Sequence, residues 1–374
     1  MANTAVQEKE TGFHTIEYAS QWQLMRIRFR KHKVAVGAMV LLGLLYLTAA
    51  LATFISPIDP YLKSLEYREA PPQRLHFFES GRFYIRPFVY PLKGTMNRET
   101  YKRTYEEVRD KKYFVRFFVR GFEHKLLGIF KTDVHLFGTD DPAIPIHLFG
   151  TDMMGRDVFG RTLYGSRVSL TIGLVGVAIS FFLGIFIGGI SGLFGGVVDE
   201  IIQRIVEVFT SIPKLPLWMG LSAALPTSWP VIRMYFAITV ILSLVSWPGL
   251  ARVVRGRFLT LREEEYVVAA YINGQRDLQV IFTHMLPSFM SHIIASLTLA
   301  IPSMIIGETA LSFLGLGMQP PAVSWGVLLK VAQNVHTLSL APWLMIPGLF
   351  VIVTVLAFNF VGDGLRDAAD PYSK

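Results

Sequence analysis

Residues 168–198 read VSLTIGLVGVAISFFLGIFIGGISGLFGGVV, a stretch without a single charged side chain. At about 1.5 Å of rise per residue, a helix of this length exceeds the roughly 30 Å hydrocarbon core of a bilayer. Small residues recur within it at every fourth position: Gly176, Ser180, Gly184, Gly188, Gly192 and Gly196. Because small side chains at that spacing let helix backbones approach closely in lipid, the pattern predicts a tightly packed central helix of a membrane bundle.

Further long, largely apolar stretches lie on both sides of this one. They occupy residues 34–55, 200–225, 231–251, 288–316 and 341–361. The stretch at 200–225 is interrupted by Pro213 and Pro216. Hydrophobic residues make up 52% of the chain and charged residues only 17%, a balance that a soluble domain with a polar surface rarely shows. We therefore predict an all-α integral membrane protein with six transmembrane helices.

Basic residues determine the expected orientation in the membrane. One cluster precedes the first span: Arg26, Arg28, Arg30, Lys31 and Lys33. A second lies in the loop 252–287: Arg252, Arg255, Arg257, Arg262 and Arg276. Since short basic segments stay in the cytoplasm, the N-terminal segment 1–33, this loop and the tail 363–374 are expected there. The net charge of +8 then indicates membrane lipid as a partner, and no nucleic acid, because no basic domain stands apart from the apolar runs.

Residues 56–149 are expected to form a small α+β extracytoplasmic insert between the first two spans. Residues 74–90, with a turn at Glu79-Ser80-Gly81, and residues 113–119 and 126–136 look like strands, whereas 101–112 favours a helix. The hexapeptide HLFGTD occurs twice, starting at His135 and at His147. Two similar turns leading to the second span are the expected explanation of this repeat, and a paired binding function is the alternative.

The loop 252–287 carries the pattern of two helices joined by a turn. Thr260 followed by Glu263 matches a capping box and predicts a helix over 261–272. Asn273 and Gly274 then predict its end, because glycine readily adopts the left-handed conformation that closes a helix.

The second helix of the pair is expected to start with Asp277 as its cap and to end before Pro287. Ala269 and Ala270 in the first helix are small, so they permit close packing against a partner protein.

This loop resembles the coupling loop of permeases from binding-protein-dependent ABC importers. The pattern of that family is Glu-Ala-Ala, three residues, Gly, nine residues, Ile, one residue and Leu-Pro. The matching positions are Ala269, Ala270, Gly274, Leu286 and Pro287. Val268 stands where the pattern has Glu, and His284 stands where it has Ile. The helix–turn–helix shape is retained, but an ionic contact by that Glu has no counterpart here.

Three other segments resemble the second permease subunit of dipeptide, oligopeptide and nickel importers. They are residues 150–170, beginning GTDMMGRD, residues 308–317, reading ETALSFLGLG, and the tail at 362–371. The resemblance implies the type I ABC importer permease fold, a core at 150–362 and a place in the bacterial inner membrane. It implies peptide import, with nickel or another small solute as the alternative cargo. An ion-driven secondary transporter is the alternative class.

The same resemblance implies partners and site residues. The expected partners are two ABC ATPase subunits, a second homologous permease and an extracytoplasmic solute-binding protein. The residues expected to couple to the ATPases are Glu265, Ala269, Ala270, Gly274, Gln275, Arg276, Asp277, Leu286 and Pro287. Because the chain has no Gly-x-x-x-x-Gly-Lys-Ser/Thr loop, we expect a transport subunit without an ATP site of its own, and no cofactor.

Charged residues inside predicted spans are costly in lipid and are therefore candidates for function. Glu207 and Lys214 are seven residues apart and are expected on one face of the third span, either lining the translocation path or forming a structural pair. Arg204 is expected to pair with Glu207. For Glu308, the two interpretations are a brace for irregular backbone and a role in substrate contact or gating.

Asp152 and Asp157 raise the question of a cation site before the second span. Two carboxylates with one glycine fall short of a calcium loop, so capping of the turn and pairing with Arg156 or Arg161 are expected instead. The nine histidines form no metal-ligand cluster in the sequence, and no metal is expected.

Overall fold

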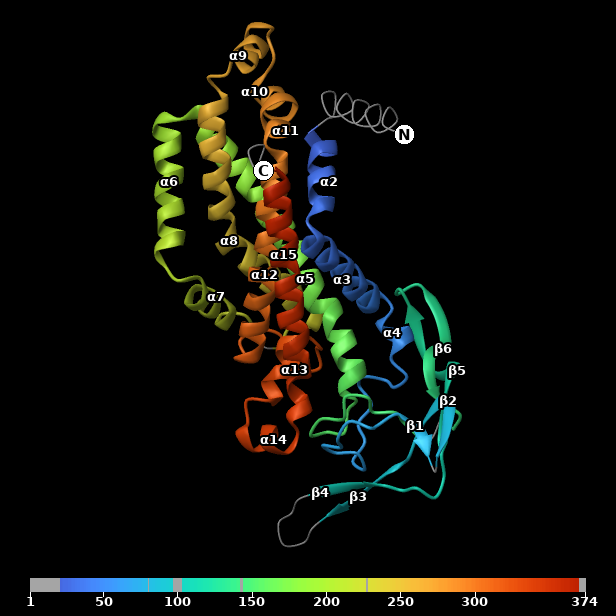
Figure 1. Cartoon of the computed structure of the whole chain (residues 1–374). Helices are drawn as coiled ribbons and strands as arrows, with labels where there is room; N and C mark the ends of the chain where they lie inside the picture. The colour runs from blue at the N-terminus through green and yellow to red at the C-terminus, as the bar shows by residue number, and fades with distance from the viewer. Residues whose placement is uncertain (1–20, 80, 97–102, 142–143, 227, 370–374) are drawn as a thin grey trace, which may run out of the picture.

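The computed structural model describes residues 21–79, 81–96, 103–141, 144–226 and 228–369. Its long helices form one bundle, and its strands gather at one end of that bundle (Figure 1). Five helices among the described residues are long and apolar enough to cross a membrane: Lys33–Ala50 (α3), Val158–Phe194 (α5), Val231–Leu261 (α8), Met290–Phe313 (α12) and Pro342–Ala369. The last of these joins the short helix η2 (Pro342–Met345) to α15 (Ile346–Ala369).

The glycine-rich helix α5 packs closely against α8, as its small-residue spacing predicts. A Cβ atom on Gly188 would lie 2.4 Å from the Ala251 carbonyl oxygen, and one on Gly192 would lie 2.8 Å from the Arg255 carbonyl oxygen. Side chains longer than hydrogen would therefore force the two backbones apart. Gly196 is the exception, because it begins the next helix and has open space around it.

Replacing Gly188 with Ala is expected to destabilise the bundle by about 1–3 kcal/mol, since the methyl group would overlap backbone of α8. Gly43→Ala is the matched control, because Gly43 lies in the spanning helix α3 with no atom within 4 Å of the added Cβ. The midpoint of thermal unfolding in detergent should fall for the first variant and stay for the second. Equal midpoints would contradict close α5–α8 packing.

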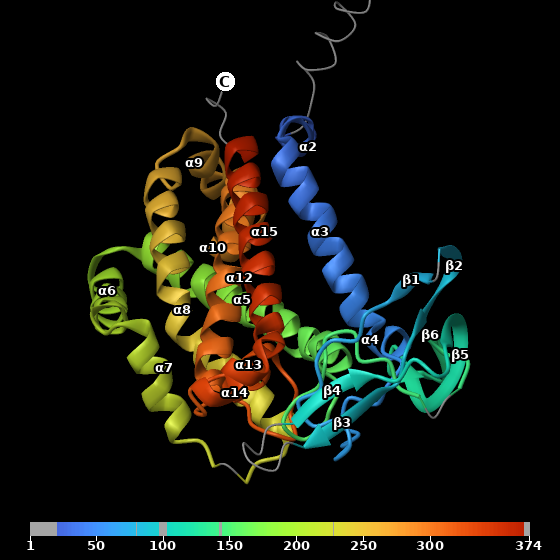
Figure 2. The ribbon, with the colours of Figure 1, turned by 60° about the horizontal axis from the view of Figure 1, so that its bottom comes forward.

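The third expected span is divided into two helices, α6 (Gly196–Ser211) and α7 (Lys214–Ala223). Ile212 and Pro213 between them are extended, and Pro213 has no N–H to continue the helix. Figures 1 and 2 show α6 and α7 on the side of the bundle opposite α3. Neither helix is long enough to cross a membrane alone, so the structure contains no continuous third span in its described part.

The N-terminal and C-terminal helices pack against each other. Helix α2 (Gln21–Lys31) and α3 lie beside α15, where a Cβ on Gly364 would overlap that of Ala35. Helix α15 also packs on α12, since a Cβ on Gly362 would lie 2.5 Å from Leu299 Cδ2. Because α15 continues to Ala369, most of the polar tail is helical. Helices α13 (Trp325–Val331) and α14 (Val335–Leu340) lie at the strand end of the bundle (Figure 2).

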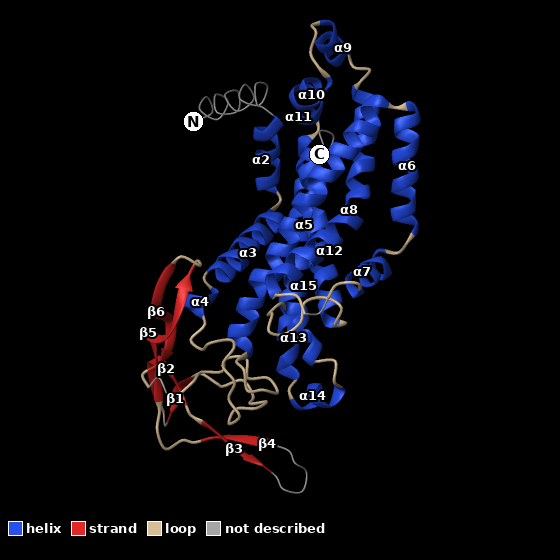
Figure 3. Cartoon of the chain, turned by 180° about the vertical axis from the view of Figure 1, so that it is seen from behind, coloured by secondary structure: helices blue, strands red, loops and turns tan. Residues whose placement is uncertain are grey.

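In the described residues, six strands follow the short helix α4 (Ala52–Ile55), and they lie in two sheets. Strands β1 (His76–Glu79), β2 (Arg82–Val89), β5 (Tyr113–Leu126) and β6 (Phe130–Thr139) form the first sheet in the order β1-β2-β5-β6. Strands β3 (Leu92–Met96) and β4 (Arg103–Glu107) form the second. Figure 3 shows the strands to one side of the long helices, with β5 and β6 beside α4 and with β3 and β4 farther away.

Two expectations for this region are wrong. The helix predicted at 101–112 is absent from its described part, where β4 instead pairs with β3 and Tyr105 packs over Gly94. The described residues of 56–149 therefore contain strands and no helix. The first HLFGTD copy lies mostly in β6, and only the second, from His147, forms a turn before α5. In both places, pairing with the preceding strand, β3 for β4 and β5 for β6, overrides the local pattern.

Candidate functional site

A helical element projects from the end of the bundle opposite the strands (Figure 1). It consists of α9 (Glu265–Ile272), α10 (Asp277–Val280), the π-helical turn η1 (Ile281–Met285) and α11 (Leu286–Ser288), which leads into α12. Figure 3 shows the C-terminal part of α15 near the same end. The element connects α8 to α12, so both of its ends are joined directly to candidate membrane spans.

The turn after α9 has the hydrogen bonds of a Schellman motif. Gly274 has a φ of +78°, and its N–H donates to the Tyr271 carbonyl at 2.9 Å. The Gln275 N–H donates to the Ala270 carbonyl at 3.1 Å. These bonds satisfy the last carbonyl groups of α9 and require a left-handed residue at 274, as the sequence predicts.

The start of α9 differs from its prediction. Thr260 lies inside α8, where its hydroxyl donates to the Gly256 carbonyl at 3.3 Å, so it caps no helix. Helix α9 begins only at Glu265, and its N-cap Glu264 makes no side-chain cap hydrogen bond. The prediction of a capping box at Thr260 and Glu263 is therefore wrong. The physical reason is that Phe258, buried among the residues of the projecting element, carries α8 through this point.

The second half of the element begins one residue earlier than predicted. Arg276 is the N-cap of α10, and Asp277 is the first residue inside it. The Gln279 side chain accepts a hydrogen bond from the Arg276 N–H at 3.1 Å. Gln275 reaches across to His284, with 2.8 Å between Gln275 Oε1 and His284 Nε2, so its amide ties the turn to η1.

The element has a buried inner face and an exposed outer face. Val267 and Ala270 of α9 are buried in a small core with Val280 and Met285. The outer face exposes Glu265, Tyr266, Val268, Ala269, Ile272, Arg276, Asp277 and Leu278. The two expected alanines thus separate into an inner packing residue, Ala270, and an exposed residue, Ala269. Leu286 is buried behind η1, while Pro287 is exposed.

Tyr271 is partly buried against the small core of this element. Burial, together with the carboxylate of Asp277, raises the pKa of Tyr271 above its usual value. The projecting element is a small, internally packed body with a mixed apolar and charged outer face.

The candidate path residues in the third span do not share a helix face, contrary to prediction. Glu207 lies in α6 and Lys214 begins α7, after the break at Pro213. Glu207 instead pairs with Arg204 at 3.0 Å, as expected for residues three apart on one helix. Both side chains of this pair are exposed.

Glu308 is fully buried at the centre of a hydrogen-bond network. The hydroxyl groups of Ser169 and Ser312 donate to its carboxylate at 3.2 Å and 2.8 Å. The same two hydroxyls accept the backbone N–H groups of Trp325 and Met318. Glu308 therefore joins α5 and α12 to the chain that leads into α13. Sequence reasoning missed both serines. Ser169 is 139 positions from Glu308, which no local pattern links, whereas Ser312 is four residues away on the same helix and could have been noticed.

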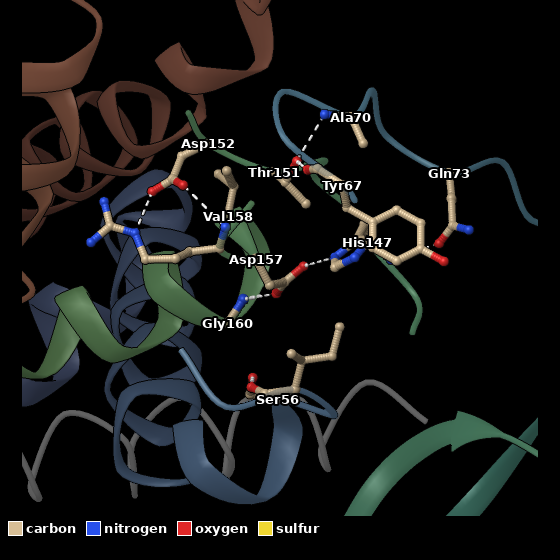
Figure 4. Close-up of polar contacts among 12 residues, drawn as sticks. Ser56, Tyr67, Ala70, Gln73, His147, Thr151, Asp152, Asp157, Val158 and Gly160 are labelled. Atoms are coloured by element: carbon tan, nitrogen blue, oxygen red, sulfur yellow. Dashed lines mark hydrogen bonds and ion pairs between the residues drawn. The ribbon is translucent and has the colours of Figure 1, made fainter. Parts of the chain in front are cut away.

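Asp152 and Asp157 hold the turn before α5 (Figure 4). Asp157 caps α5 by accepting the Gly160 N–H at 2.6 Å, and its other oxygen lies 3.0 Å from His147 Nδ1. Asp152 pairs with Arg156 at 2.7 Å. Both carboxylates thus have the capping and pairing roles expected of them. Among the described residues no group of three or more His, Asp or Glu side chains is placed to hold a metal ion.

This turn also joins the strand region to the core (Figure 4). The Thr151 hydroxyl donates to the Tyr67 carbonyl and accepts the Ala70 N–H. The Gln73 side chain accepts the His147 N–H at 2.7 Å. Sequence reasoning missed Gln73 and His147, whose partners lie 74 and 10 positions away.

Asp157→Ala is expected to destabilise the protein by about 1–3 kcal/mol, because the cap of α5 is lost and the buried His147 loses its partner. Asp157→Asn keeps an oxygen for the Gly160 N–H and should cost clearly less. Thermal unfolding of the two variants in detergent measures the difference, and equal losses would contradict the capping role.

Long apolar helices packed through glycines, with a projecting helical element at one end, define a multi-spanning helical membrane protein. The chain belongs to the family of inner membrane components of binding-protein-dependent transport systems, whose family model matches residues 184–373. A second model, the N-terminal TM domain of oligopeptide transport permease C, matches residues 20–72. Residues 73–183, which include all six strands, lie outside both matches.

Several curated proteins are similar to this chain over most of their length. The oligopeptide transport system permease protein OppC of Bacillus subtilis is 38% identical to this chain. The match covers 63% of this chain and 75% of the OppC chain. The dipeptide transport system permease protein DppC of the same organism is 40% identical, and the match covers 62% of this chain and 70% of the DppC chain. OppC of Haemophilus influenzae is 40% identical, and the match covers 64% of this chain and 75% of that OppC chain.

Among solved structures, the chain is similar to the MetNI methionine ABC transporter in an inward-facing conformation. The TM-score is 0.43 at 16% sequence identity, and the match covers 55% of this chain and 95% of the other.

Proposed function

We propose that this chain is the transmembrane permease subunit of an ATP-driven importer of oligopeptides or dipeptides, and that it forms half of the translocation path. The observation that carries the proposal is the 38–40% identity to permeases named for oligopeptide and dipeptide transport, over more than 60% of the chain. Nickel or another small solute is the alternative cargo within the same architecture.

The projecting element is proposed to couple the permease to two ABC ATPase subunits. Its outer face offers Glu265, Arg276 and Asp277 for ionic contacts beside the small side chain of Ala269. Val268 stands where the family pattern given above has Glu, which makes this face more apolar than that pattern.

The inner side of the element transmits the movement. Because Ala270 and Leu286 are buried in the same cluster as Phe258 of α8, the element cannot move independently of that span. Gly274 and Gln275 fix the turn, and Pro287 marks the passage from η1 into α12. A rigid link of this kind passes a closing motion of the ATPases into α8 and α12, as alternating access requires.

The broken pair α6–α7 is proposed to complete a sixth crossing of the type I importer arrangement. Its exposed charges, Arg204, Glu207 and Lys214, would be costly against lipid. A second homologous permease facing this side of the bundle would shelter them and place Glu207 and Lys214 along the path.

The proposed orientation places residues 1–33, the loop 252–287 and the tail 363–374 in the cytoplasm, on the side of the ATPases. The insert 56–149 then faces outward, between the first span at 34–55 and the core at 150–362. It is available there to the extracytoplasmic solute-binding protein. The basic side chains of α2 and of the loop favour this orientation.

Co-purification decides between an ATP-driven importer and an ion-driven secondary transporter. We expect the tagged chain to bring down a subunit with a P-loop, and ATP hydrolysis by the isolated complex to rise when substrate-loaded binding protein is added. A chain that purifies without such a subunit and transports in response to a proton or sodium gradient would contradict the proposal.

A further inference from the structure

The hairpin of β5 and β6 is held against α4, directly after the first membrane span. His135 Nδ1 lies 3.1 Å from the Thr53 carbonyl oxygen, and the ring of Phe118 lies 6.3 Å from that of Phe54. Figures 1 and 3 show the closed end of the hairpin reaching back, along the direction of α8, α12 and α15, to the level of α3. With α3 crossing the membrane as proposed, this end lies near the boundary between bilayer and water.

The closed end of the hairpin is apolar, although hairpin turns are usually polar. Leu127, Ile129 and Phe130 have exposed fractions of 54%, 74% and 64%. On α3, Leu44 and Leu47 are also more than half exposed. The hairpin end and the helix beside it in the first span therefore both present large apolar side chains to their surroundings.

Leucine at position 127 opposes the local backbone preference. Leu127 has a φ of +51° and Gly128 a φ of +76°, so both central residues of the turn are left-handed. Asparagine followed by glycine is the favoured pair for such a turn, because a residue with a bulky side chain resists that conformation. An apolar side chain is present here in spite of that cost, which indicates a use for it outside the hairpin.

Two lysines flank this apolar end. Lys125 and Lys131 are directly opposite each other in the β5–β6 pairing, both exposed, and neither forms an ion pair with a described residue. Like charges at that position repel each other. Burial, together with His135, lowers the pKa of His124, so the neighbouring ring adds no charge at neutral pH. Anionic groups brought between the lysines would remove the repulsion.

We propose that residues 125–131 anchor the insert to the membrane surface. Leu127, Ile129 and Phe130 enter the boundary between headgroups and acyl chains, and Lys125 and Lys131 bind the phosphates of anionic lipids. The anchor fixes the insert against the first span and limits its tilt. It requires only that α3 spans the membrane, and is independent of the transported substrate and of ATP coupling.

The chain contains no cysteine, so single cysteines can report on the hairpin in the intact complex. Ile129→Cys carries an environment-sensitive fluorophore in nanodiscs of phosphatidylcholine with about a quarter phosphatidylglycerol. Met96→Cys on β3, exposed but on the other sheet, is the matched control. We expect a nitroxide on the lipid chain to quench the Ile129 probe several-fold more than the Met96 probe, and aqueous iodide to show the reverse order.

Two further variants test the apolar and the basic side chains of the hairpin separately. Leu127→Asn suits the turn, so the hairpin stays folded while lipid quenching at position 129 falls. Lys125→Gln with Lys131→Gln should remove the dependence of that quenching on phosphatidylglycerol. The proposal is overturned if iodide quenches the Ile129 and Met96 probes equally. It is also overturned if the Ile129 probe is shielded only after the solute-binding protein is added, which would assign the hairpin to a protein partner.

Discussion

Gly274→Val is expected to abolish coupling between ATP hydrolysis and transport. Gly274 has a φ of +78°, a conformation that a β-branched residue adopts only at a cost of about 1–3 kcal/mol. No atom lies within 4 Å of an added Cβ, so the effect comes from the backbone and not from a clash. The turn should therefore open. Because about 1.4 kcal/mol corresponds to a factor of ten, this backbone cost should lower ATP-driven uptake by about tenfold or more.

Gly274→Asn is the control for this prediction, because asparagine tolerates the left-handed conformation and often closes helices. It should retain most of the uptake and of the substrate-stimulated ATP hydrolysis. Both variants should reach the membrane in normal amount, since the turn lies outside the bundle. Survival of uptake and of ATPase stimulation in Gly274→Val would remove the coupling role from this element.

Glu308→Ala is expected to destabilise the bundle by about 2–5 kcal/mol, the second large effect. It leaves a cavity at a fully buried position and removes the acceptor of the Ser169 and Ser312 hydroxyls. Those hydroxyls also hold the backbone at Trp325 and Met318, so the loss should spread to the region before α13. The amount of folded complex that is recovered in detergent measures this loss of stability.

Glu308→Gln separates bracing from gating. Glutamine keeps one oxygen acceptor and the side-chain volume, so a purely structural brace should be weakened and not lost. Reduced assembly, with uptake falling in proportion, is the expected result. Normal assembly with lost uptake would contradict bracing and assign Glu308 a role in gating.

Features that depend on short sequence distances could be predicted. The small residues of α5 recur every fourth position, and that spacing alone indicates close helix packing. The end of α9 follows from Asn273 and Gly274, since glycine supplies the left-handed residue. The pairing of Asp152 with Arg156 likewise joins residues four apart.

Features that depend on tertiary contacts could not be predicted. The Thr260–Glu263 pattern is a valid start signal, but packing of Phe258 in the projecting element extends α8 through it. Residues 103–107 are strand because β3 lies beside them. One partner of Glu308, Ser169, comes from another helix, and that serine in turn accepts the Trp325 N–H, which no local pattern reveals.

Uptake of labelled peptides into proteoliposomes tests the central claim most directly. The vesicles contain the complete complex, with ATP enclosed on the ATPase side and substrate-loaded binding protein on the other. The account predicts that peptide accumulates only with hydrolysable ATP, that Gly274→Val prevents accumulation and that Gly274→Asn permits it. Accumulation driven by an ion gradient without ATP, or accumulation of nickel with exclusion of peptides, would contradict it.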